Sequence, residues 1–138
     1  MRGMGRRSAL AVGMAAVPAF ALARSTAAAT HGPEEGREIA PGVRQVDLGN
    51  REAMIPGYKT VSMRDLVYQP GASTANPGMK NDMVCHCLEG ELSIDQGEGR
   101  QFAVKKGAVW SCRVGLPENT KNTGDTVAIM RVIDLLRE

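Results

Sequence analysis

Residues 83–104, MVCHCLEGELSIDQGEGRQFAV, decide the fold. Short segments with apolar residues at alternate positions are separated here by connections that contain Gly90, Gly97 and Gly99, a pattern typical of successive antiparallel strands. The pattern predicts strands over residues 83–88, 91–95 and 101–104, joined as a meander. Helical periodicity is nearly absent from the flanking chain, which indicates an all-β protein.

The flanking segments continue this pattern. Residues 59–68 end at the turn pair Pro70-Gly71, and further strands are predicted over residues 108–114 and 126–136. Residues 59–68 alternate apolar with polar side chains, which predicts a half-buried strand. The alternating positions are Val61, Met63 and Val67 on one side and Thr60, Ser62 and Arg64 on the other.

Residues 1–29 have the pattern of an export signal. The pair Arg6-Arg7 precedes an apolar run of 15 residues, 9–23, and resembles the twin-arginine signal. Small residues at 27–29 predict cleavage before Thr30, with cleavage after Ala23 as an alternative. A disordered Ala-rich tail is the other interpretation. Export predicts a periplasmic or secreted protein.

Charge and hydropathy exclude two classes of partner. The chain has 17 basic and 15 acidic residues, and loss of residues 1–29 leaves 13 basic and 15 acidic ones, so no basic footprint for nucleic acid remains. The apolar run is shorter than the roughly 20 residues of a membrane-spanning helix, so no membrane anchor is expected. The remaining chain divides into residues 30–57, a flexible lead-in and N-terminal strand, and residues 58–138, the main domain. Its small size makes a homodimer the expected assembly.

Two motifs within residues 58–135 resemble the cupin family. Its second motif contains two glycines, a proline, a histidine and an asparagine. The glycines and the asparagine match Gly107, Gly115 and Asn122, whereas Arg113 replaces the proline and Glu118 replaces the histidine. The resemblance implies a single-domain jelly-roll β-barrel after removal of the signal peptide.

The first cupin motif departs further from the family. Gly71 and Gly90 match, but Pro77, Met79 and Met83 stand where two histidines and a glutamate hold a metal in cupin enzymes. His31 and His86 are the only histidines, so no other alignment restores the pair. Because one carboxylate does not hold a divalent transition metal, the resemblance argues against the usual oxygenase, isomerase or lyase activity. It assigns no catalytic residues.

The sulfur-containing residues allow two interpretations. Alternation places Met83, Cys85 and Cys87 on one face of their strand, which the cupin resemblance points into the barrel. Together with Met79 and Glu118 they form a candidate site for a soft metal such as copper. The alternative is that these residues are ordinary core residues and that no cofactor is bound.

The three cysteines also allow a disulfide. Side chains two apart in one strand lie about 6.6 Å apart, so Cys112 is a better partner for Cys85 or Cys87 than these are for each other. One thiol then remains unpaired. A thiol-redox role is the alternative, although no positive charge nearby in the sequence lowers a thiol pKa.

Three residues are candidates for ligand binding at the barrel mouth. Arg113 is a candidate anchor for an anionic molecule, Glu118 a candidate orienting group, and Trp110 a candidate stacking surface. An Arg113–Glu118 salt bridge and core packing of Trp110 are the alternatives. The sequence thus favours a non-catalytic small-molecule-binding or accessory protein over a copper-dependent enzyme or metal-handling protein.

Overall fold

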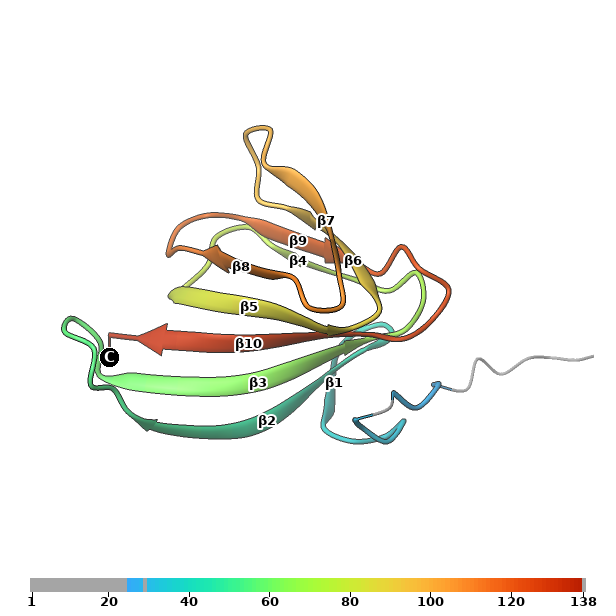
Figure 1. Cartoon of the computed structure of the whole chain (residues 1–138), viewed down its shortest axis with the longest axis horizontal. Helices are drawn as coiled ribbons and strands as arrows, with labels where there is room; N and C mark the ends of the chain where they lie inside the picture. The colour runs from blue at the N-terminus through green and yellow to red at the C-terminus, as the bar shows by residue number, and fades with distance from the viewer. Residues whose placement is uncertain (1–24, 29, 138) are drawn as a thin grey trace, which may run out of the picture.

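A computed structural model describes residues 25–28 and 30–137, and these form an all-β structure of two antiparallel sheets (Figure 1). The predicted twin-arginine pair and apolar run lie outside the described residues. The ten strands are β1 (Arg37–Ala40), β2 (Val43–Glu52), β3 (Thr60–Tyr68), β4 (Ser73–Asn76), β5 (Asp82–Glu89), β6 (Glu91–Asp95), β7 (Gln101–Lys105), β8 (Val109–Cys112), β9 (Glu118–Lys121) and β10 (Ala128–Leu136). No helix in this part of the chain is long and apolar enough to span a membrane.

The two sheets are built from interleaved strands. One sheet has six strands in the order β1-β2-β3-β10-β5-β8, and the other has four in the order β4-β9-β6-β7. The last strand, β10, lies between β3 and β5, so the C-terminal strand completes the centre of the larger sheet (Figure 1). Pairings between strands far apart in sequence therefore hold the sheets together.

The predicted meander is wrong at its first connection. β6 and β7 form a hairpin, but β5 and β6 belong to different sheets. Gly90 stands where the chain crosses between them, with φ of 75°. A Cβ at this position would lie 2.6 Å from the Val127 carbonyl oxygen, so the close backbone approach also requires glycine. The sharp crossing resembles a hairpin turn in sequence because both need a residue with positive φ.

Residues 30–57 contain two strands and, ahead of them, a buried histidine. β1 and β2 extend the larger sheet beyond β3. His31 is buried against the outer face of that sheet, where its Nε2 lies 2.8 Å from Asp65 Oδ2 and its Nδ1 lies 2.9 Å from Glu35 Oε2. Arg131 of β10 donates two hydrogen bonds to Asp65, at 2.8 and 2.9 Å. This cluster attaches the segment to two strands.

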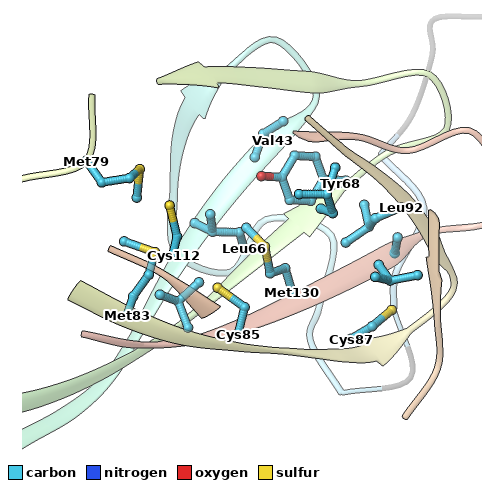
Figure 2. Packing of buried hydrophobic residues seen from close by; sticks show 14 residues of the cluster. Val43, Leu66, Tyr68, Met79, Met83, Cys85, Cys87, Leu92, Cys112 and Met130 are labelled. Atoms are coloured by element: carbon cyan, nitrogen blue, oxygen red, sulfur yellow. The ribbon is translucent and has the colours of Figure 1, made fainter. Parts of the chain in front are cut away.

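The main hydrophobic core lies between the two sheets (Figure 2). Met83, Cys85 and Cys87 all point into it, which confirms the predicted inward face of their strand. In β3, Leu66 and Tyr68 point inward. Arg64 points to the same side of the strand because it lies two positions before Leu66. Val67 is instead buried on the outer face of the sheet, in a smaller cluster with Val46 and Ile129. Both faces of β3 are covered, so its alternation alone did not reveal which face is inside.

Candidate functional site

A cavity of about 260 Å³ opens between the two sheets at one end of the core. Strands β3, β5 and β10 of the larger sheet and β4 and β9 of the smaller one contribute to its wall, together with the end of β1. The wall is mixed in character, with apolar, hydroxyl, amide and charged side chains. Its apolar and thioether members include Leu66, Met79, Met83, Met130 and Val132, and its polar members include Arg64, Ser73, Thr74, Asn76, Glu118 and Thr120.

Glu118 is the acidic residue of the cavity wall. It begins β9, is only 5% exposed, and accepts a hydrogen bond from Trp110 Nε1 at 2.9 Å on its Oε1. Burial raises the pKa of the Glu118 carboxyl above its ordinary value, although donors from Trp110, Gln96 and Cys112 offset part of that effect. The Glu118 carboxyl group is therefore fixed at the cavity wall, and the role of orienting a ligand stays a prediction.

Arg64 is the cationic residue of the cavity wall, and sequence reasoning missed it. Its Nε and Nη2 donate to the two carboxylate oxygens of Asp134, at 2.9 and 3.3 Å, and its Nη1 donates to Gln45 Oε1 at 3.1 Å. Asp134 also accepts a hydrogen bond from Asn81 Nδ2 at 3.0 Å. The guanidinium charge is thus balanced by a carboxylate inside the barrel.

Arg113 does not pair with Glu118, so the predicted salt bridge between them is wrong. Arg113 is exposed in the turn that follows β8, and its carbonyl accepts a hydrogen bond from Leu116 N at 3.2 Å. It is also absent from the wall of the cavity. Trp110 takes the place beside Glu118 because residues 110 and 112 share the inward face of β8.

Trp110 packs against the core, as the alternative interpretation expected, and it is not among the residues that line the cavity. Its ring packs partly buried against the core and meets Phe102 edge-on, at 6.3 Å between centroids, while its indole N–H donates to Glu118. The indole N–H therefore fixes the position of the Glu118 carboxylate by a hydrogen bond from outside the cavity wall.

Three of the five proposed soft-metal residues line the cavity, whereas Cys85 and Cys87 are buried in the core and do not line it. Met79, Met83 and Glu118 line the same cavity, so the alignment that placed them at the cupin metal-ligand positions brings together residues that are neighbours in space. Cys87 lies further along β5, where its Sγ contacts the carbonyl oxygens of Glu89 and Gly90 at 3.5 and 3.6 Å. Figure 2 shows Cys87 beside Leu92, well away from Met79 and Met83. The set of five therefore does not converge on one point.

Met130 is a further thioether in the cavity wall that the sequence did not single out. It lies on β10 directly opposite Cys87 in register, and its side chain extends toward Leu66 (Figure 2). Among the described residues there is no cluster of three or more His, Cys, Asp or Glu side chains placed to hold a metal ion. Any metal in this cavity would depend on the thioethers.

The disulfide that the sequence allows between Cys112 and Cys85 or Cys87 is not formed, and all three cysteines are free. β8 does pair with β5, but Cys112 lies opposite Met83 and Cys85 lies opposite Trp110. The two thiols are therefore diagonal neighbours, whose Cα atoms are typically about 7–8 Å apart, beyond ordinary disulfide reach. Burial raises the pKa of the Cys112 thiol to about 11 and also raises the pKa values of Cys85 and Cys87. Raised pKa values disfavour the thiolate needed for redox chemistry.

No family model and no curated protein matches the chain. Solved structures do. A cupin domain of Cnp3 from Schizosaccharomyces pombe is 18% identical with a TM-score of 0.57, over 68% of this chain and 61% of that one. A predicted oxalate decarboxylase from Thermotoga maritima is 22% identical with a TM-score of 0.56, over 68% and 80%. A cupin superfamily protein from Desulfitobacterium hafniense is 17% identical with a TM-score of 0.55, over 75% and 84%.

These similarities and the two-sheet architecture define the fold of the protein. The chain has the jelly-roll β-barrel fold of the cupins, as the sequence motifs implied. At these identities the similarity establishes the fold alone. The function has to be argued from the cavity of this chain.

Proposed function

We propose that this protein is a small-molecule-binding barrel whose ligand occupies the cavity between the two sheets. The observation that supports the proposal is the cavity itself, which combines an apolar and thioether wall with a few fixed polar groups. That combination is typical of small-molecule sites. A volume of about 260 Å³ equals the liquid volume of roughly nine water molecules, which restricts the ligand to a small compound.

The single tryptophan provides a direct test. Trp110 donates to a carboxylate of the cavity wall, so a ligand that contacts Glu118 changes the environment of the indole. A panel of small neutral, anionic and cationic fragments is titrated while Trp110 fluorescence and the melting temperature are recorded. Binding raises the melting temperature because the ligand binds only the folded state.

Two substitutions assign any binding to the cavity. Ala40 lines the cavity, and Ala40→Phe fills it, so this variant is expected to lose fragment binding. Ala103 is exposed on β7, and Ala103→Phe serves as the matched control that retains binding. Fragments that bind the Ala40→Phe variant as well as the parent protein would show that the cavity is not the site.

A soft-metal site is the second candidate function, and the three thioethers in one cavity favour it. Met79, Met83 and Met130 are soft ligands suited to Cu(I). Metal analysis of the protein isolated without added metal salts is expected to give about one copper per chain if this function holds. Met83→Leu lowers that copper content, whereas Met63→Leu outside the cavity leaves it unchanged. Copper-free protein argues for the small-molecule function.

We also propose that the chain is exported by the twin-arginine route and cleaved before Thr30. The pair Arg6-Arg7 and the small residues 27–29 support this proposal. Cleavage there would remove Thr26, which exchanges hydrogen bonds with the Gln69 side chain at 3.0 and 3.1 Å. Amino-terminal sequencing of the exported protein is expected to begin at Thr30, and lysine at both positions 6 and 7 is expected to retain the chain in the cytoplasm.

A further inference from the structure

The charges inside the barrel do not balance, and the excess is negative. Arg64 and Asp134 neutralise each other through two hydrogen bonds. Glu118 is the remaining ionisable carboxyl group of the cavity wall. No second cation lines the cavity among the described residues, and Arg113 is exposed outside it. Glu118 is therefore a buried acid without a cationic partner of its own.

The groups packed around Glu118 do not supply the missing charge. They are Trp110 and Cys112 of β8, Cys85 of β5, Tyr68 of β3, Gln96 after β6 and the Arg64–Asp134 pair between β3 and β10. The two thiols are neutral because burial raises their pKa values. The indole donates one hydrogen bond and carries no charge. A buried carboxylate without a counter-charge is costly, and a bound cation removes that cost.

The rest of the cavity wall suits an organic cation with a short carbon chain. The hydroxyls of Thr74 and Thr120 lie in the same wall as Glu118. Both interact with the Tyr68 hydroxyl, at 2.7 Å for Thr74 Oγ1, and a hydroxyl oxygen has two lone pairs, so each retains capacity to accept a further hydrogen bond. Leu66, Met83 and Met130 provide the apolar surface. Thioether sulfur is polarisable and accepts weak hydrogen bonds, so it tolerates a neighbouring ammonium group better than a purely aliphatic wall does.

Building on the proposed small-molecule function, we infer that the ligand is a small organic amine bound as its ammonium ion. Its N–H groups donate to the Glu118 carboxylate, and its carbon chain lies among the thioether and leucine side chains. This assignment reverses the anionic ligand that Arg113 suggested from sequence. The reversal follows because the one arginine in the cavity wall is already neutralised and the acid is not.

The test compares three probes with the same carbon chain: butylamine, butanol and butyrate. The full chain is labelled with ¹³C on its methionine methyl groups, so that Met79, Met83 and Met130 report on the cavity and Met54, which is 95% exposed, serves as an internal control. Each probe is titrated at pH 7.5 to about 10 mM, a range suited to ligands with few atoms. Butylamine is expected to shift the three cavity signals and leave Met54 unshifted. Butyrate is expected to have no effect.

Two variants test the role of the carboxylate. Glu118→Gln keeps an acceptor for Trp110 and is expected to weaken butylamine binding by about 10- to 100-fold, as for loss of a charged hydrogen bond. Arg113→Gln changes an exposed charge and is expected to leave binding unchanged. Lowering the pH to 4 protonates Glu118 and weakens butylamine binding in the parent protein, without the same effect on butanol.

The outcomes separate this inference from the broader proposal. Butyrate binding at least as tight as that of butylamine, or equal butylamine binding by the parent protein and Glu118→Gln, would overturn the amine assignment and leave a small-molecule site in place. The absence of any shift of the cavity methyl signals with all three probes would also overturn the amine assignment. The fragment panel read by Trp110 fluorescence then decides separately whether the barrel binds any small molecule.

Discussion

At the scale of single residues, Glu118 carries a cost for stability that depends on pH. Burial raises the pKa of the Glu118 carboxyl above its ordinary value of 4.5. At pH values above 4.5 the folded state therefore holds this proton more tightly than the unfolded state does. Stability contributed by this group is therefore lost as the pH rises through that range. Glu118→Gln is expected to raise the melting temperature at pH 7, by roughly 4–8 °C per kcal/mol recovered, and to leave it unchanged at pH 3.5. Melting curves at both pH values test this, and an equal gain at both would contradict the burial argument.

The thiols provide a second prediction at this scale. Cys85, Cys87 and Cys112 are free, buried and raised in pKa, so they present little thiolate to a reagent. Ellman's reagent is expected to react slowly with the native protein and to count three thiols after unfolding in denaturant without reductant. A count of one in denaturant would instead indicate a disulfide.

At the scale of elements, Gly90 determines how the chain passes from β5 to β6. An alanine there combines the cost of a positive φ with a Cβ 2.6 Å from the Val127 carbonyl oxygen and 2.8 Å from Ala128 Cα. Gly71 has a similar φ of 79°, but a Cβ added there would meet no atom within 4 Å, which makes it a matched control. Gly71→Ala is expected to lower the free energy of unfolding by about 1–2 kcal/mol, for the backbone alone.

The steric contact adds to that cost at the sheet crossing. Gly90→Ala is expected to lower the free energy of unfolding by roughly 1–3 kcal/mol more than Gly71→Ala, because backbone atoms of β10 and its approach must move. Urea denaturation of the two variants measures the difference. Equal losses would mean that the β5–β6 crossing relaxes freely.

At the scale of the whole molecule, the His31 cluster joins the N-terminal segment to the outer face of the larger sheet. Both ring nitrogens face carboxylate oxygens, of Glu35 and Asp65, so the protonated ring satisfies both and the neutral ring only one. Burial lowers the pKa of His31, but the bonds to these two carboxylates outweigh it and the net pKa is raised. The attachment is therefore strongest when the imidazole is charged.

This raised pKa sets the direction of a pH effect. The contribution of His31 to the free energy of unfolding is complete below pH 6.5, the ordinary pKa of the ring. It declines as the pH rises through the higher pKa of the folded state. His31→Gln is expected to lower the melting temperature more at pH 6 than at pH 9. Asp65 keeps its bidentate partner Arg131 in this variant, which limits the loss. A melting-temperature difference that does not change with pH would contradict the charged ring.

The sequence by itself determined the local properties of the chain. Alternation predicted the all-β class and the shared face of Met83, Cys85 and Cys87, because side chains of a strand alternate between its faces wherever the strand is placed. The cupin resemblance implied that this face points inward. Glycine positions marked the sharp connections, since positive φ is a local requirement. The cupin motifs also predicted that Met79, Met83 and Glu118 lie close together, because the spacing of the motif positions is that of residues facing the same barrel interior.

Tertiary structure decided which strands pair and which charges meet. β5 and β6 are adjacent in sequence yet lie in different sheets, and the Arg64–Asp134 pair joins residues 70 positions apart. The inward position of Arg64 and the burial of His31 both depend on such long-range contacts. Local patterns do not specify them, because the partner of each strand is chosen by packing two sheets around one core.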